Sequence, residues 1–333
     1  MATQIRRRSF ILMLAGTLVA LSLATGAQQL KRPSRIGVLM NLASDDQESQ
    51  VRFATFLQAL HQSGWIEGYN VRIDTRWGAG DANRTRRYAA ELVALAPDVI
   101  VAASTPALGP LQSATRTVPI VFVQVADPVG GGFVDNLQRP GGNMTGFSVF
   151  DYSIGTKWLE LLKQVFPSVS RVVVLREPGT AYGSGQFGAI QTAAASFGVE
   201  LSQLSVRDTG EIERGFDTFA SEPNRGLIVT ASTFTAVHRE EIIALAARYR
   251  LPAVYPFRYF VTSGGLMSYG PDSIEPFRRA AGYVDRILNG EKPTDLPVQA
   301  PTKFETVLNV RTATDLGFSV PPTLLAHADE VIK

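Results

Sequence analysis

Short runs rich in β-branched residues alternate with amphipathic helical patterns along this chain, and this alternation constrains the fold more than any other feature. The segment 35–40 predicts a buried strand. After it, Phe53, Phe56, Leu57 and Leu60 recur at the spacing of one helix face, and the pattern stops at a glycine. Strands that alternate with helices in this way build parallel βαβ units. We therefore expect an α/β protein.

The strand pattern occurs in two passes, which predicts two similar lobes. The first pass predicts five strands, at 35–40, 71–77, 98–103, 119–125 and 144–150. The second pass predicts strands at 171–176, 199–206, 226–230, 252–255 and 265–269. A chain of 333 residues is also long for one core, because single cores stop growing near about 250–300 residues. We predict two doubly wound, Rossmann-like parallel-sheet lobes.

The N-terminal segment has the layout of a secretory signal peptide. Three arginines at 6–8 precede an apolar run at 10–23, which ends in the small residues 24–27. A membrane anchor is the alternative, but the run is shorter than the roughly 20 apolar residues of a spanning helix. Residues 7–10 partly match the twin-arginine export pattern, which leaves two export routes open. We expect a signal peptide at 1–27 and a periplasmic protein.

The composition excludes several classes of protein. There is no cysteine, so the chain has neither a disulfide nor a lipid-modified N-terminal cysteine. The formal net charge is +2, and three of the arginines belong to the predicted signal. No basic patch remains that would indicate a nucleic-acid partner.

An Ala-Ser-Thr segment occurs once in each pass, at the point where a strand gives way to a helix. Ser104 and Thr105 follow the third strand of the first pass, and Ser232 and Thr233 occupy the matching place in the second. Ligands of open α/β sheets bind outside these carboxyl ends. Pro106 lies in the first turn of its helix, whose free N–H groups suit a carboxylate. We predict ligand contacts here; simple helix capping is the alternative.

Other polar and aromatic residues follow the predicted strands. Asp127 could pair with an amine or a sugar hydroxyl, or it could only cap the glycine-rich turn after it. Glu177 and Tyr182 lie beyond the first strand of the second lobe, Phe257 beyond a later one, and Ser268 near the end of the last. Such side chains suit a sugar or an aromatic ring. We include all five among the candidate ligand contacts.

No motif in the sequence supports a nucleotide-binding site, a metal site or a hydrolytic active site. The segment 183–188 spells GxGxxG and Asp208 follows at a suitable spacing, but the first glycine does not follow its strand directly. There is no Walker loop, GxSxG elbow or HExxH motif. His61, His238 and His327 are scattered. We expect that the protein binds no cofactor or metal and is not an enzyme.

An ordered set of segments resembles the substrate-binding proteins of ABC transporters in the tryptophan/tyrosine-type family. These segments are 105–107, 118–122, 127–129, 139–146, 264–270, 292–298, 303–309, 316–317 and 321–322. The resemblance implies a type I periplasmic binding protein fold, in which a hinge joins two lobes and a small solute is trapped between them. It also implies that helix 274–288 packs on the first lobe, and that the chain crosses again near 301–304. The implied partners are a small-molecule ligand and the permease subunits in the membrane.

Domain boundaries follow from this resemblance together with the strand pattern. We predict a signal peptide at 1–27, a first lobe at 28–150 plus 271–300, and a second lobe at 151–270 plus 301–333. A monomer fits a receptor that must open and close.

The ligand class stays open at this stage. The resemblance implies an acidic or amide side chain at the strand exits marked by Glu177 and Ala231 in members that bind amino acids. Here Glu177 carries a charge, whereas the exit at Ala231 offers only hydroxyls. An amino acid and another small polar or aromatic solute are both possible ligands. A receptor that signals to a sensor kinase or chemoreceptor is an alternative function, and an exported α/β enzyme is a second, although no nucleophile–base pair supports it.

Overall fold

The computed structural model describes residues 32–219 and 223–333, and residues Ser34–Lys333 form one compact unit. The predicted signal peptide lies outside the described residues. No helix in the described ranges combines the length and the apolar character needed to cross a membrane.

The first lobe is built on a five-stranded parallel sheet in the order β2-β1-β3-β4-β5. Its strands are β1 (Ser34–Met40), β2 (Val71–Trp77), β3 (Val99–Ala103), β4 (Ile120–Val125) and β5 (Met144–Ser148). The central strands β3 and β4 are buried along their whole length, as expected of a parallel sheet covered on both faces. All five strands lie where the β-branched runs predict them.

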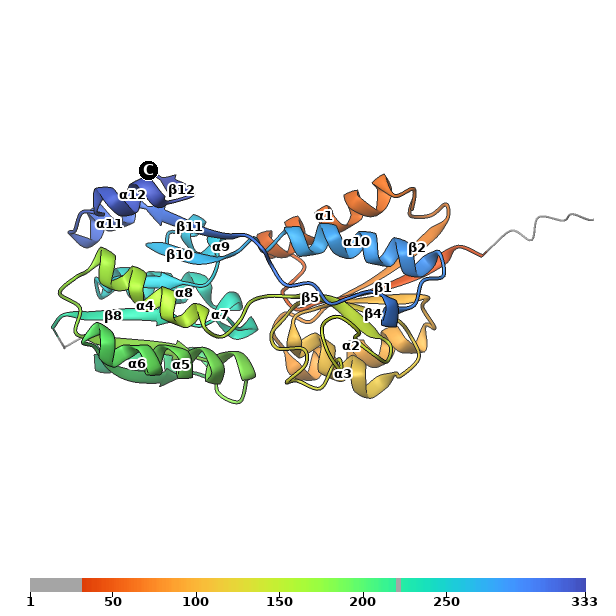
Figure 1. Ribbon diagram of the computed structural model, residues 1–333, viewed down its shortest axis with the longest axis horizontal. Helices are drawn as coiled ribbons and strands as arrows, with labels where there is room; N and C mark the ends of the chain where they lie inside the picture. Colours follow the sequence, from red (N-terminus) through yellow and green to blue (C-terminus); the bar gives the residue numbers. More distant parts are fainter. Residues whose placement is uncertain (1–31, 220–222) are drawn as a thin grey trace, which may run out of the picture. The chain divides into compact units, whose positions relative to one another are not determined.

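Helices cover both faces of this sheet. Figure 1 shows α1 (Gln47–Gln62) beside α10 (Glu275–Leu288), and α2 (Ala82–Ala94) beside α3 (Thr105–Ala114). Phe56 of α1 and the apolar side of α10 form one core with β1, and α2 and α3 form a second core on the opposite face. Helix α10 comes from late in the chain, and it packs against the first sheet as the family resemblance implies.

The second lobe is built on a seven-stranded sheet in the order β12-β11-β10-β9-β8-β6-β7. Its strands are β6 (Arg171–Arg176), β7 (Glu200–Ser205), β8 (Arg225–Val229), β9 (Ala253–Tyr255), β10 (Met267–Pro271), β11 (Phe304–Asn309) and β12 (Glu330–Ile332). The sequence pattern predicted only the first five. Strand β11 runs antiparallel to β10, so this sheet is mixed rather than wholly parallel.

Shorter helices flank the second sheet. They are α4 (Ile154–Val165), α5 (Ala181–Ala194), α6 (Thr209–Phe219), α7 (Thr233–Val237), α8 (Arg239–Arg248), α9 (Arg258–Thr262), α11 (Val310–Leu316) and α12 (Pro322–His327), with a 3₁₀ turn at Ala195–Phe197. A second 3₁₀ turn, Pro293–Asp295, packs beside β5 of the first sheet. The core is dominated by large apolar side chains, among them the fully buried Trp158 of α4. The α/β architecture with two sheet-based lobes agrees with the predicted fold class.

The glycines of the GxGxxG segment lie inside helix α5 and do not form a phosphate-binding turn. A Cβ added at Gly185 would lie 2.6 Å from the ring of Tyr152. Across the same helix pair, a Cβ at Gly155 would lie 2.8 Å from Ile190. Gly185 and Gly155 therefore serve close packing around helices α4 and α5.

The chain runs between the two sheets at three places: between β5 and α4, between β10 and α10, and before β11. At the third place the segment follows the edge of the first sheet, where Gln299 bridges to Phe147 and the Thr145 hydroxyl donates to the Leu296 carbonyl at 2.5 Å. The boundaries at 28–150 plus 271–300 and at 151–270 plus 301–333 stay a prediction.

Candidate ligand-binding pocket

A cavity of about 270 Å³ lies at the carboxyl ends of strands from both sheets. The first lobe contributes residues that follow β1, β3 and β5, a residue near the end of β4, and one from helix α1. The second lobe contributes residues that follow β6, β8 and β9. The 17 lining residues are Asn41, Arg52, Ser104, Thr105, Pro106, Gln124, Val149, Glu177, Gly179, Thr180, Tyr182, Ala231, Ser232, Thr233, Ala236, Phe257 and Tyr259. This is the position at which open α/β sheets bind ligands.

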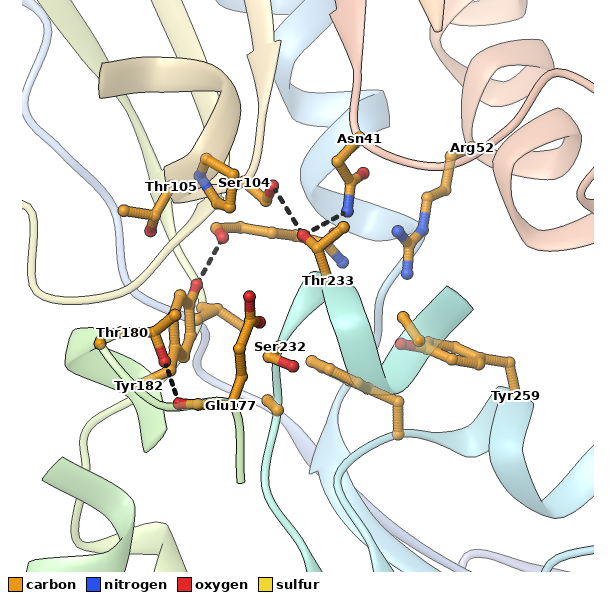
Figure 2. A pocket seen from close by; sticks show the side chains of 17 residues that line it. Asn41, Arg52, Ser104, Thr105, Glu177, Thr180, Tyr182, Ser232, Thr233 and Tyr259 are labelled. Atoms are coloured by element: carbon orange, nitrogen blue, oxygen red, sulfur yellow. Dashed lines mark hydrogen bonds between the residues drawn. The ribbon is translucent and has the colours of Figure 1, made fainter. Parts of the chain in front are cut away.

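Seven of the nine predicted contacts line this cavity. They are Ser104, Thr105, Glu177, Tyr182, Ser232, Thr233 and Phe257. Figure 2 shows Ser104 and Thr105 above Glu177 and Tyr182, with Ser232 and Thr233 beside them. The structure therefore brings together side chains that are far apart in the sequence.

Ser104 begins helix α3 without capping it. Its backbone has φ 71° and ψ 163°, a conformation that L-residues rarely adopt, and its side chain makes no capping hydrogen bond. The hydroxyl instead lies 3.4 Å from Oγ1 of Thr233. The backbone of Ser104 thus directs its hydroxyl to the pocket, which the capping alternative does not explain.

Ser232 is used differently, because it caps helix α7. Its hydroxyl accepts a hydrogen bond from the Thr235 backbone N–H at 3.0 Å, and the Thr235 hydroxyl oxygen accepts one from the Ser232 backbone N–H at 3.1 Å. This reciprocal arrangement is a capping box. The structural alternative therefore applies to Ser232, while its neighbour Thr233 accepts from Nδ2 of Asn41 at 3.2 Å.

Glu177 supplies the negative charge of the pocket. Its Oε2 atom is buried and has no hydrogen-bond partner among the described residues. Burial raises the pKa of Glu177 above its ordinary value, and the hydroxyl of Ser232 and the backbone of Phe234 oppose this rise by stabilising the carboxylate. A partly desolvated carboxylate with a free oxygen is suited to a cationic group of a ligand.

The aromatic walls come mainly from the second lobe. The hydroxyl of Tyr182 donates to the Gln124 carbonyl at 2.7 Å, so this side chain presents its ring to the pocket. Burial raises the pKa of Tyr182, which keeps it neutral. Phe257 stacks on Tyr259 with ring centroids 5.4 Å apart. These rings suit a ligand with an apolar or aromatic portion.

Asp127 and Ser268, the other two predicted contacts, do not line this cavity. Asp127 lines a separate cavity of about 610 Å³, together with Asp151 and Tyr152. Its Oδ1 atom accepts from the Gly130 N–H at 2.8 Å, which is the capping alternative. Ser268 is a buried residue of strand β10.

Asn41 and Arg52 line the pocket, and the sequence analysis did not single them out. Asn41 directly follows β1, and Arg52 lies on α1 with only 2% of its surface exposed. The signal was present in the helix: the buried residues of α1 are Ser49, Arg52, Phe56 and Leu60, so polar residues continue the apolar stripe. A charged residue in line with a buried stripe would have identified Arg52.

Side chains of the two lobes also meet beside the pocket. Arg239 of α8 donates to Oδ2 of Asp46 at 2.6 Å. On the same side, the guanidinium groups of Arg239 and Arg52 lie 5.9 Å and 5.4 Å from the ring centroid of Tyr259. The contacts between the lobes therefore include the ion pair of Arg239 with Asp46 and the cation–π pair of Arg52 with Tyr259.

A family model decides the membership of this chain. The model for ABC transporter substrate binding proteins matches residues 35–332. The chain belongs to this family.

Relatives of this substrate-binding protein share both its sequence and its fold. The tyrosine-binding protein of Clostridioides difficile is 26% identical over 260 residues, which cover 76% of this chain and 73% of the relative. The structure of a conserved domain protein from Vibrio cholerae is 28% identical with a TM-score of 0.83. An ABC domain from Streptococcus pneumonia in complex with L-Trp is 25% identical, also with a TM-score of 0.83. Both structures cover 90% of this chain and match over 100% of their own length.

The comparisons agree with the predicted fold class and with the predicted role in solute binding. Substrate-binding proteins of this family bind small molecules and work with ABC permeases, and one of the related structures holds L-Trp. The described residues contain no group of three or more His, Asp or Glu side chains placed to hold a metal ion.

Proposed function

We propose that this protein is the periplasmic receptor of an ABC importer and that its ligand is a free α-amino acid. The observation that carries this proposal is the Glu177 carboxylate, which is partly buried in the pocket with Oε2 unpaired. An ammonium group would satisfy this oxygen and offset the desolvation of the carboxylate.

The carboxylate of the ligand has its partners close to Glu177. Figure 2 shows Ser104 and Thr105, at the start of the ten-residue helix α3, facing the region of Glu177 and Tyr182. The start of a helix stabilises an anion through its free N–H groups and its dipole. The two charged groups of an α-amino acid lie next to each other, so their partners must also be neighbours. The relatives whose printed names include tyrosine or L-Trp support the same ligand class.

The proposed mechanism is capture without chemistry. The ligand binds to one lobe, closure brings the residues of the other lobe into contact with it, and the closed receptor delivers it to the permease. We further propose that the chain is exported with residues 1–27 as its signal, that it works as a monomer, and that it catalyses no reaction. The membership of the family supports export and a role in binding without catalysis.

The test is a binding screen on the protein from residue 28 onward, which contains the compact unit Ser34–Lys333. Free amino acids, sugars and dicarboxylic acids are tested by thermal shift, then by calorimetry. A ligand at 100 times its Kd stabilises a fold by about 2.7 kcal/mol, which shifts the melting temperature by several degrees. We expect amino acids alone to give this shift. Binding of sugars or dicarboxylic acids without amino acids would contradict the proposal.

A variant of Glu177 sharpens the test. Glu177→Gln keeps the size of the side chain and removes its charge, so we expect the affinity for the amino acid to fall about 10- to 100-fold. Glu305→Gln is the matched control, because Glu305 is another partly buried carboxyl whose pKa is raised by burial, and it does not line the pocket. Equal affinities of Glu177→Gln and the unmodified protein would show that the ammonium binds elsewhere.

A further inference from the structure

Arg52 is a buried cation whose hydrogen-bonding capacity is mostly unused. Its Nε atom donates to Oε1 of Glu48 at 3.0 Å, and its guanidinium group faces Tyr259 and Phe277, with 5.4 Å and 5.7 Å to the ring centroids. A guanidinium group has five N–H donors. Apart from the hydrogen bond of Nε to Glu48 and the contact of the guanidinium group with Tyr259, the Nη1 and Nη2 donors have no partner among the described residues. Arg52 lines the pocket, so these donors are available to a ligand.

Asn41 is the second residue with an unsatisfied atom at this place. Its Nδ2 group donates to Thr233, which leaves Oδ1 buried without a partner among the described residues. Figure 2 shows Asn41 and Arg52 entering the pocket from the same side, whereas Glu177, Thr180 and Tyr182 lie on the other. An amino acid that binds by its ammonium group at Glu177 thus has Asn41 and Arg52 at the other side of the same cavity, where its side chain would extend.

The two unsatisfied atoms define the chemical group that fits between them. Arg52 needs a hydrogen-bond acceptor, and Oδ1 of Asn41 needs a donor. A carboxylate only accepts, so it would leave Asn41 unsatisfied, and Glu48 already balances the charge of Arg52. An ammonium group only donates and would be repelled by Arg52. A hydroxyl group both donates and accepts.

We propose that Arg52 and Asn41 recognise a hydroxyl group at the end of the ligand's side chain. The rings of Phe257 and Tyr259 lie along the pocket wall, which favours a hydroxylated aromatic side chain such as that of tyrosine. Arg52 donates to the hydroxyl oxygen, and the hydroxyl donates to Oδ1 of Asn41. This proposal rests on the proposed function, and it makes Arg52 and Asn41 the residues that determine specificity within the amino acids.

The first test compares L-tyrosine with L-phenylalanine on the unmodified protein by calorimetry. Phenylalanine lacks only the hydroxyl, so it leaves the donors of Arg52 and the acceptor of Asn41 unsatisfied in a desolvated site. We expect tyrosine to bind about 10- to 100-fold more tightly, because hydrogen bonds to charged groups contribute in this range. Equal affinities would overturn this inference and leave the proposed function standing. If no amino acid binds, the proposed function fails, and the inference fails with it.

The second test measures the same ratio in variants. Arg52→Met keeps much of the apolar stem between Tyr259 and Phe277 but removes the donors, and Asn41→Ala removes the acceptor. We expect the tyrosine preference to fall toward one in Arg52→Met and to weaken in Asn41→Ala. A preference that is unchanged in both variants would overturn the inference. If Arg52→Met does not fold, Asn41→Ala and the ratio in the unmodified protein still decide.

Arg239→Met is the matched control for a nonspecific effect of losing an arginine. Arg239 lies over the same Tyr259 ring as Arg52, at 5.9 Å, but it pairs with Asp46 and does not line the pocket. Its loss removes a contact between the lobes and is expected to weaken both ligands alike. The ratio of the two affinities therefore stays at its original value in Arg239→Met. A fall in the ratio as large as that in Arg52→Met would contradict recognition by Arg52.

Discussion

The two Ala-Ser-Thr segments of this protein have the same sequence and follow strands of the two sheets, yet their serines have different roles. Ser232 has extended backbone angles and completes a capping box, so its hydroxyl stabilises helix α7. Ser104 has φ 71°, caps nothing, and directs its hydroxyl toward Thr233 across the pocket. Sequence and topological position are therefore not enough to assign the role of such a hydroxyl. The backbone conformation decides whether it caps the helix or points into the pocket.

The largest expected difference between the contributions of the two lobes is in the pH dependence of ligand affinity. Among the residues that line the pocket, the carboxyl group with a raised pKa, Glu177, belongs to the second lobe. The pKa of Glu177 lies above its ordinary value of 4.5 owing to burial. An ammonium ligand favours the ionised form, so binding must release a proton at pH values below the raised pKa. The affinity should then fall by about tenfold for each pH unit below that pKa, which is about 1.4 kcal/mol per unit.

Calorimetry over a pH series, in buffers with different ionisation enthalpies, measures both the affinity and the released proton. The stability of the ligand-free protein depends on pH in the opposite direction. Because the folded state holds the Glu177 proton more tightly than the unfolded state, its contribution to the free energy of unfolding is present at low pH and is lost as pH rises from 4.5 through the raised pKa. Glu177→Gln should abolish the pH dependence of the affinity and remove the contribution of Glu177 to the pH dependence of stability, while that of Glu305 stays. An affinity that stays constant as the pH falls would contradict pairing of Glu177 with an ammonium group.

The capping role of Ser232 predicts the next largest effect. Ser232→Ala removes the acceptor for the Thr235 N–H and should lower the free energy of unfolding by about 1 kcal/mol, measured by urea denaturation. Ser104→Ala is the matched control, because no capping bond is lost there, and we expect a much smaller change in stability. Equal losses of stability in the two variants would mean that Ser104 and Ser232 cap their helices alike.

The sequence predicts the first lobe more fully than the second. Strands β3 and β4 are continuous apolar runs buried on both faces, and their pattern is unambiguous. The sequence pattern did not predict β11 and β12. Strand β11 is antiparallel to β10 and breaks the βαβ alternation, and β12 has only three residues and lies at the edge of the sheet. Such strands are defined by their tertiary partners more than by their own residues.

The same limit applies to the pocket. The strand exits at Ser104, Glu177 and Thr233 could be predicted, because parallel strands end at a common edge. Asp127 could not be separated from them, since its backbone has φ 38° and its carboxylate turns back to its own loop. Arg52 was missed because a polar residue on an amphipathic helix is expected to face solvent, although it lies in line with Phe56 and Leu60. The rings of Tyr259 and Phe277 that pack around its guanidinium group come from distant helices and could not be read from that pattern.

The smallest expected effect is the change in stability when each serine is replaced by glycine. It is the most direct test of the two serines, because we expect the change to have opposite signs at Ser104 and Ser232. Ser104→Gly removes the strain of the left-handed backbone, which costs roughly 1–3 kcal/mol for a residue other than glycine, against a conformational-entropy cost of about 0.5–1 kcal/mol for the glycine. We expect a net gain in stability of about 0.5–1 kcal/mol. Ser232→Gly should instead lose a few tenths of a kcal/mol, because glycine is a weaker cap than serine.

Urea denaturation of both variants measures these signs, and calorimetry with the amino-acid ligand measures their consequence for binding. Because Ser104→Gly also removes a hydroxyl from the pocket, the more stable variant should bind its ligand more weakly, whereas Ser232→Gly should retain most of its affinity. A serine that destabilises the fold but strengthens ligand binding is a residue retained for function at the expense of stability. A loss of stability in Ser104→Gly would instead make Ser104 a structural residue like its counterpart in the second lobe.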